Sequence, residues 1–184
     1  MNAWWSYFLP VFCAGLVFGA VAGSGAFRMK IVRSKDRPGE PDLVDQPRQR
    51  RVTFLVAGVA LSIIAAVLWH GPLGAAERFA AEVERGAREV LAANDAPNGV
   101  NVQIHRGPLT RQLILSGPSN DFQQAEAARL LSQIPGVHDA TWTRSAGIPL
   151  IVEGAIAAVL GFLLGLLLAY LVELRRRYNS QWTW

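Results

Sequence analysis

The three histidines, His70, His105 and His138, are the side chains best suited to bind a metal or to move a proton. Imidazole ligates metals and titrates near neutral pH. The three lie far apart in the sequence, and no HExxH, CxxC, Ser-His-Asp or Gly-rich phosphate-loop pattern accompanies them. The single cysteine, Cys13, has no second thiol for a disulfide or a Cys-rich metal site. We therefore expect no metal centre, no cofactor and no enzymatic activity.

Two polar residues lie inside or beside apolar runs, where a specific role is conceivable. His70 follows Trp69 at the end of one run, and it either ligates a pigment or haem or forms a polar tip at the membrane edge. We favour the tip, because a lone interfacial histidine is more often that than a ligand. Glu153 lies roughly one helical turn inside another run, and an acid within a span is a candidate functional site. Near the membrane surface it reaches headgroups or water instead, which is the interpretation we favour.

Three apolar runs must position these residues, at residues 4–27, 52–69 and 148–172. Hydrophobic residues make up 51% of the chain, and each run approaches or exceeds the roughly 20 residues that cross a bilayer. In the first run the basic residues follow the apolar stretch rather than precede it, which favours a retained span over a signal peptide. The predicted organisation is a transmembrane helix at 1–33, a basic cytoplasmic loop at 34–51, a second transmembrane helix at 52–71, an extramembrane domain at 72–146, and a third transmembrane helix with a cytoplasmic tail at 147–184.

Small residues recur at intervals of four in each run, which places them on one face of a helix. Such a face lets two helices approach closely, and close packing drives helix association in lipid. The partner is either another span of this chain or a span of another subunit. The predicted packing positions are Gly15, Gly19, Gly23, Gly58, Ser62, Ala66, Gly161, Gly165 and Ala169.

The net charge of +4 comes from basic residues that cluster beside the apolar runs, which indicates membrane orientation rather than nucleic-acid binding. Residues 28–51 carry eight basic and four acidic side chains, and three arginines at 175–177 follow the last run. Short loops rich in Lys and Arg stay in the cytoplasm. We predict a bacterial inner-membrane protein with a periplasmic N-terminus, a periplasmic domain and a cytoplasmic C-terminus. The prolines of the basic loop predict irregular backbone there.

The segment between the second and third runs is polar enough to fold in water. Residues 76–91 have apolar positions every three or four residues, which predicts an amphipathic helix. Residues 100–104 and 111–116 alternate in polarity and predict an antiparallel hairpin. A second helix follows, with an expected apolar face of Phe122, Ala125, Ala128, Leu131 and Ile134, and then a third strand at 137–143. The predicted fold is three transmembrane α-helices plus a small α+β domain of order αββαβ.

Residues 113–142, LILSGPSNDFQQAEAARLLSQIPGVHDATW, carry three features of one family. An apolar strand ends in Ser116-Gly117, an Ala-rich helix contains Arg129, and Pro-Gly-Val at 135–137 opens the last strand. Together with the element order, these features resemble the BON-type domain of bacterial envelope proteins. The resemblance implies association with phospholipid or other envelope components, and it supplies no catalytic residues. Family members are usually soluble or lipid-anchored, whereas this domain is tied to apolar runs at both ends.

Two functions are compatible with this organisation. The first is a non-catalytic accessory or scaffold subunit of a larger membrane complex, such as a respiratory or photosynthetic assembly. In that case the expected partners are other membrane-protein subunits, and the domain is a docking surface. The alternative is a membrane-tethered phospholipid- or envelope-binding module for envelope maintenance. Nucleic acid is not an expected partner.

Overall fold

The computed structural model describes residues 2–28, 30–33, 41–44, 47–94, 99–143 and 147–180. The chain divides into two compact units. The domain unit comprises Met1–Pro10 and Val67–Gly154, and the helix unit comprises Val11–Ala66 and Ala155–Trp184. By this division, one end of each of the three long helices described next belongs to the domain unit.

Three helices are long and apolar enough to cross a membrane. They are α1 (Ala3–Phe27), α2 (Arg48–His70) and α5 (Leu150–Ser180). The three predicted apolar helices are confirmed. Helix α2 begins at Arg48, earlier than the predicted apolar run, because a helix continues through basic residues that have good helix propensity.

The predicted irregular backbone of the basic loop is wrong in part. Strand β1 (Lys30–Arg33) pairs with β2 (Pro41–Val44) in an antiparallel arrangement, with Lys30 opposite Val44. Valine and isoleucine favour extended backbone, and proline is tolerated as the first residue of a strand, as Pro41 is here. The stretches at 34–40 and 45–46 lie outside the described residues.

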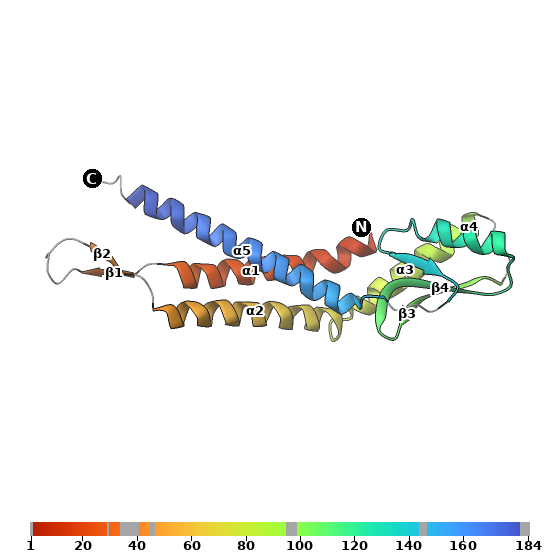
Figure 1. Cartoon of the computed structure of the whole chain (residues 1–184), viewed down its shortest axis with the longest axis horizontal. Helices are drawn as coiled ribbons and strands as arrows, with labels where there is room; N and C mark the ends of the chain where they lie inside the picture. The colour runs from red at the N-terminus through yellow and green to blue at the C-terminus, as the bar shows by residue number, and fades with distance from the viewer. Residues whose placement is uncertain are drawn as a thin grey trace. The chain divides into compact units, whose positions relative to one another are not determined.

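The domain unit contains the predicted order of elements. Helix α3 (Ala75–Ala93) precedes β3 (Asn101–Arg106) and β4 (Leu109–Ser116), and α4 (Asp121–Leu131) precedes β5 (Asp139–Thr141). The sheet has the strand order β3-β4-β5, antiparallel between β3 and β4 and parallel between β4 and β5. The hairpin is therefore confirmed. Helices α3 and α4 contact each other and pack on β3 and β5 respectively (Figure 1).

The core of this unit lies between the two helices and one face of the sheet. Opposed pairs place Val102 beside Leu115 and Ile104 beside Leu113, and all four side chains are buried. The helices contribute their own apolar faces to this core, from Phe79, Val83, Ala87 and Leu91 of α3 and from Ala127 and Leu131 of α4. Burying each of the larger side chains among these, Val, Leu, Ile or Phe, stabilises the fold by about 1.5–3 kcal/mol.

The predicted apolar face of the second domain helix is wrong in part. Phe122 is 80% exposed and Ala125 is exposed, whereas Ala127, which lies outside the predicted face, is buried; Leu131 is buried as predicted. The side chain of Asn120 accepts a hydrogen bond from the backbone of Gln123 and forms a capping box, which fixes where α4 begins. Helix α4 has alanines on two neighbouring faces, and either face could pack against the core. Apolar spacing alone therefore does not determine which face is buried.

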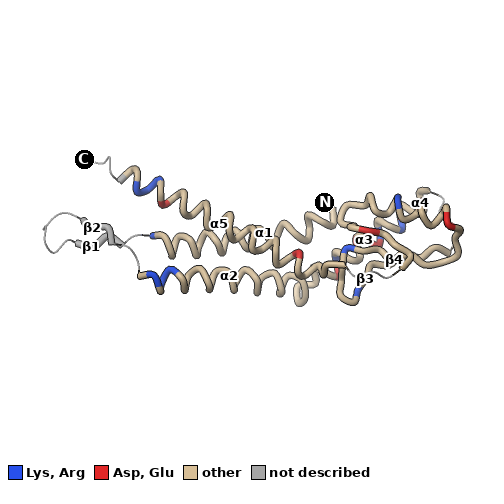
Figure 2. Tube along the Cα trace, viewed as in Figure 1, with Lys and Arg blue, Asp and Glu red and all other residues tan. Residues whose placement is uncertain are grey.

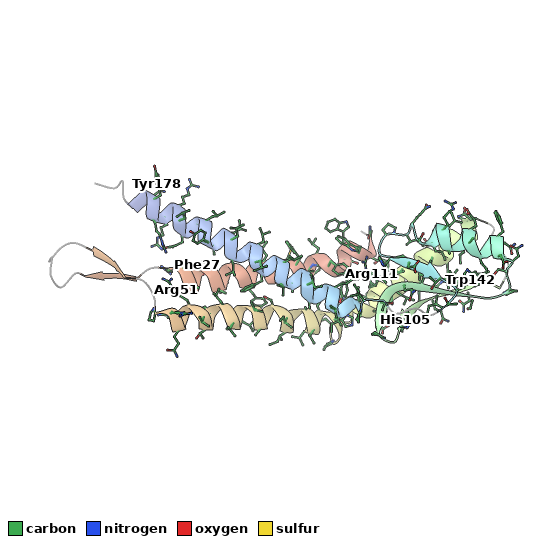
Figure 3. The ribbon with its side chains drawn as sticks, viewed as in Figure 1. Phe27, Arg51, His105, Arg111, Trp142 and Tyr178 are labelled. Carbon is green, nitrogen blue, oxygen red and sulfur yellow. The ribbon has the colours of Figure 1, made fainter. Side chains whose placement is uncertain are left out.

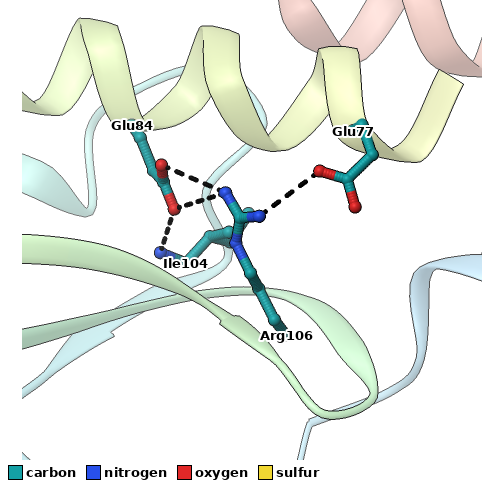
Figure 4. Close-up of polar contacts among 4 residues, drawn as sticks. All are labelled: Glu77, Glu84, Ile104 and Arg106. Atoms are coloured by element: carbon teal, nitrogen blue, oxygen red, sulfur yellow. Dashed lines mark hydrogen bonds and ion pairs between the residues drawn. The ribbon is translucent and has the colours of Figure 1, made fainter. Parts of the chain in front are cut away.

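A carboxylate of α3 ties that helix to β3. Glu84 accepts a hydrogen bond from the backbone N–H of Ile104 at 3.1 Å and an ion pair from Arg106 at 3.2 Å (Figure 4). Glu77 forms a second ion pair with Arg106, at 3.3 Å. Glu84 is only 13% exposed, whereas Glu77 is 78% exposed. The two acids therefore hold the same arginine in different surroundings.

Replacing Glu84 by alanine is expected to destabilise the domain by about 1–3 kcal/mol, because the Ile104 N–H and Arg106 lose a charged acceptor. Glu77→Ala is the matched control and is expected to cost about 0–1 kcal/mol, since its ion pair is exposed. Thermal unfolding of the detergent-solubilised protein measures both. Equal losses for the two variants would contradict the assigned role of Glu84.

Candidate functional site

Tyr7 is the centre of a polar and aromatic cluster in the domain unit. It lies in the first turns of α1 and is 2% exposed. Its hydroxyl forms a hydrogen bond of 2.7 Å with Nδ1 of His70, the last residue of α2. The indole N–H of Trp69 donates to the Tyr7 carbonyl at 3.1 Å, and the Phe79 ring packs against Tyr7 with 5.7 Å between centroids. The start of α1, the end of α2 and the start of α3 thus meet at the Tyr7 side chain.

A short connection holds α2 and α3 in this arrangement. Helix α2 ends at His70 and α3 begins at Ala75. Gly74 has φ +68°, a left-handed conformation that costs glycine little, and it lets the chain reverse from one helix into the next. Leu73 and Gly74 donate backbone hydrogen bonds to Leu68 and Gly71, which satisfies carbonyls at this end of α2.

Glu153 forms an ion pair with Arg111 of β4, and the Nε–Oε2 distance is 2.7 Å. The two side chains are 20% and 22% exposed. Glu153 therefore has a charged partner within the domain unit, which the interpretation that it reaches headgroups or water did not include. An isolated bridge between Thr110 and Pro149 brings the start of α5 beside β4, so that the acid meets a partner from the domain.

Arg111, labelled in Figure 3, is the residue that sequence reasoning missed. It shares its side of β4 with Leu113 and Leu115, both of which are buried. A charge in the core register of a strand needs a partner, because burying an unpaired charge is costly. That register is the signal by which Arg111 could have been found.

The three histidines are not brought together. His70 bonds to Tyr7, so it is not merely a polar tip at the membrane edge. His105 contacts the Pro108 carbonyl through Nδ1 at 2.9 Å, and His138 is exposed. Within the described ranges, no group of three His, Cys, Asp or Glu side chains could hold a metal ion. Cys13 is exposed and free.

A cavity of about 280 Å³ opens beside the Arg111–Glu153 pair. Its lining residues are Thr110, Arg111, Gln112, His138, Asp139, Gly147, Ile148 and Glu153. Asp139 uses one carboxylate oxygen to accept the Ala140 N–H at 2.9 Å. Thr110 is 1% exposed, and its hydroxyl has no hydrogen-bond partner among the described residues. The cavity is therefore lined by side chains of both charge signs, and the Thr110 hydroxyl beside it is buried.

In the helix unit, the predicted small residues of α1 and α5 pack against each other. A side chain at Gly15 or Gly19 would collide with the backbone carbonyl of Ala158 or Phe162. The same holds in the other direction for Gly161 and Gly165, which face the backbone of α1. Farther along, a Cβ at Gly23 would lie 2.6 Å from Cβ of Ala169. The two glycine stripes thus allow the two helices to touch backbone to backbone.

The small residues of α2 are also used within the chain. A Cβ at Gly58 would lie 2.7 Å from both Ala22 of α1 and the Phe162 ring of α5. Ser62 and Ala66 are buried, and the Ser62 hydroxyl donates to the Gly58 carbonyl at 2.8 Å. All three stripes therefore serve packing inside this chain. The exposed faces of these helices carry large aliphatic side chains, including Val21, Val56 and Leu160.

Arginines gather at the start of α2 and at the end of α5 in the helix unit (Figure 2). Arg177 donates to the carbonyl of Phe27, the last residue of α1, at 3.2 Å. A cation at a helix C-terminus satisfies a free carbonyl and opposes the helix dipole favourably. The ring of Tyr170 packs edge-on against Phe27 with 5.7 Å between centroids.

Removing the Tyr7 hydroxyl, with Tyr7→Phe, is expected to destabilise the domain unit by about 1–3 kcal/mol because His70 loses its buried partner. Tyr170→Phe is the control, since that side chain is 47% exposed and its ring contact is retained. Thermal unfolding in detergent compares the two variants. A Tyr7→Phe protein as stable as the control would show that the hydrogen bond contributes little.

Neither a family model, nor a curated protein, nor a solved structure matches this chain. The assignment of a function therefore depends on the geometry of the described residues. Two features of that geometry are specific. The first is the junction, by which we mean the contacts of Tyr7 with His70 and of Arg111 with Glu153. The second is the cavity beside the Arg111–Glu153 pair.

Proposed function

We propose that this chain is a non-catalytic integral protein of a bacterial inner membrane and an accessory or scaffold subunit of a larger membrane complex. Its BON-like domain serves as a docking surface in the periplasm. The observation that supports this proposal is the junction of the domain unit, in which Tyr7 bonds to His70 and Arg111 pairs with Glu153. A simple tether needs neither contact. A domain fixed to its helix ends presents one constant surface to a partner.

The proposed orientation follows from the arginines at the start of α2 and the end of α5. Single cysteines in a Cys13→Ser background test it with a membrane-impermeant maleimide on spheroplasts. A cysteine at Glu89, whose side chain is 72% exposed in α3, should react at once. A cysteine at Arg176 should react only after the membrane is opened. The reverse pattern would overturn the proposed topology.

The subunit proposal is tested by mild detergent extraction from native membranes, followed by native electrophoresis and identification of co-migrating proteins. We expect the chain to migrate with other membrane proteins. A Glu153→Gln variant should lose much of this association while remaining folded, because the junction no longer fixes the domain. Migration of the wild-type chain only as a free species of 20.0 kDa would contradict the proposal.

The second candidate function is a membrane-tethered phospholipid- or envelope-binding module. The cavity favours it, because charged side chains line a hollow that includes Glu153, in the first turn of an apolar helix. In a spanning helix, this turn lies near the level of lipid headgroups. The use of all three small-residue stripes within the chain is compatible with this function, since the helices then need no protein partner.

A further inference from the structure

Two short segments that adjoin the long helices carry exposed aliphatic side chains. Outside α1, α2 and α5, the described part of the domain unit exposes three large apolar side chains, which are Leu73, Phe122 and Ile148. Leu73 is 57% exposed in the turn between α2 and α3, and Ile148 is 62% exposed just before α5 begins. Two of the three therefore lie where the chain leaves or enters an apolar helix, whereas Phe122 lies in α4, which adjoins none of the long helices.

The backbone holds both segments in place. The N–H of Leu73 donates to the carbonyl of Leu68 at 3.0 Å, which ties the turn to the end of α2. Pro149, next to Ile148, pairs with Thr110 of β4 in an isolated bridge. The exposure of the two aliphatic side chains is thus a property of the folded domain unit.

Tryptophans mark the same ends of α1 and α2. Trp4 and Trp5, in the first turn of α1, are partly exposed and pack edge to face with 4.8 Å between ring centroids. Trp69 is next to the last residue of α2, and the guanidinium of Arg78 lies 5.4 Å from the centroid of its ring. Tryptophan is enriched at membrane–water interfaces, because its ring is apolar and its N–H seeks a polar partner. Arginine suits the same level, since its stem covers apolar surface while its charge reaches water.

We propose that Trp4, Trp5, Trp69, Leu73 and Ile148 form a collar that is inserted into the headgroup layer on the domain's side of the bilayer. This inference rests on the proposed membrane-spanning helices and goes beyond them, because it places the base of the domain in the lipid surface rather than in water above it. The bilayer is the occupant that continuity favours, since each residue belongs to or adjoins an apolar helix and all belong to one compact unit. The contact is apolar, selects no particular lipid, and involves no residue of the elements from α3 to β5.

The collar also sets the depth of the Arg111–Glu153 pair. Glu153 lies in the first turn of α5, just beyond Ile148. A collar at the headgroup level therefore places this carboxylate at the edge of the hydrocarbon. An ionised side chain is costly there unless it is paired. The 2.7 Å contact with Arg111 of β4 provides that partner from the domain.

Depth-dependent quenching tests the collar with the full chain in liposomes. Single cysteines in a Cys13→Ser background carry the fluorophore NBD, because the six tryptophans of the chain make intrinsic fluorescence hard to assign. Leu73→Cys and Ile148→Cys report on the collar. Leu160→Cys, at an exposed position within α5, is the control inside the span, and Phe122→Cys is the control in water. The lipids carry a nitroxide at the headgroup, near the start of the acyl chain or near its end.

The labels at Leu73 and Ile148 should lose most of their emission to nitroxides at the headgroup and at the start of the acyl chain. Interfacial apolar groups lie roughly 5–10 Å into the boundary between headgroups and acyl chains, so nitroxides near the chain end should quench these labels less. The label at Leu160 should show the reverse order. The label at Phe122 should respond to a water-soluble quencher and to none of the lipid nitroxides.

The outcomes separate the collar from the spanning helices. Quenching by lipid nitroxides at Leu160, with none at Leu73 and Ile148, keeps the span and overturns the collar. In that case, a response of the collar labels to the water-soluble quencher places the base of the domain above the bilayer, and no response to either quencher places a protein partner there. Absence of lipid quenching at Leu160 overturns the span and the collar together. Lipid quenching at Phe122 equal to that at Leu73 would show that the whole domain lies on the membrane, which also overturns the collar.

Discussion

Replacing Gly19 by valine is expected to separate α1 from α5 and to destabilise the helix unit by about 3 kcal/mol or more. A Cβ at this position would collide with the carbonyl of Phe162, which is backbone and cannot move to another rotamer. The helices must then move apart along their whole contact, where Gly15, Gly161 and Gly165 also face backbone. In lipid, close packing is a main source of helix association, so its loss is not offset by a hydrophobic contribution.

Thermal unfolding of the detergent-solubilised protein measures this loss, and Gly161→Val should reproduce it from the other helix. The control is Val21→Leu, which adds bulk to α1 at a side chain that is 63% exposed and should change stability by less than about 0.5 kcal/mol. A second control, Gly86→Ala in α3, meets no atom within 4 Å and should stabilise its helix by about 0.5–1 kcal/mol. Unchanged unfolding of both valine variants would show that the close contact between the helices is not required.

Reversing the charge of Arg111, with Arg111→Glu, is expected to destabilise the domain unit by about 3 kcal/mol, because two carboxylates then share a largely buried position. The Arg111→Glu, Glu153→Arg double variant should recover much of this loss, since the pair is restored in the opposite sense. Amide hydrogen exchange at the start of α5, together with thermal unfolding, reports whether the junction has opened.

The exposed pair of Arg129 and Glu126 supplies the control for this reversal. The two side chains are 59% and 42% exposed and lie 2.6 Å apart at neighbouring turns of α4. Arg129→Glu is therefore expected to lower the melting temperature much less than Arg111→Glu does. If the two reversals had similar effects, or if the double variant were no better than Arg111→Glu, the Arg111–Glu153 contact would not hold the junction together.

The apolar helices and the element order of the domain could be predicted from the sequence, because each depends on local composition and periodicity. The small-residue stripes were also predictable as helix faces, and the sequence left their partners open. Choosing between a span of this chain and a foreign subunit requires knowing that Gly19 meets Phe162 and that Gly58 meets Ala22. Those contacts depend on how the helices pack, which residue spacing does not determine.

The junction and the cavity were not predictable for the same reason. Arg111 and Glu153 are far apart in the sequence and meet only because the chain before α5 pairs with β4. Tyr7 meets His70 through the packing of α1 on α2. Phe122 shows the opposite error, since the periodicity suggested burial and the side chain is exposed beside the capped start of α4.

The position of Glu84 has a consequence for the exposed edge of the sheet. Among the described strands, β3 is an edge strand of the sheet, and an edge strand invites strands of other molecules to pair with it. Glu84 already accepts a hydrogen bond from the backbone N–H of Ile104, and the charged side chain of Arg106 pairs with Glu84 at the same edge. These two contacts therefore disfavour the addition of a strand from another molecule at this edge.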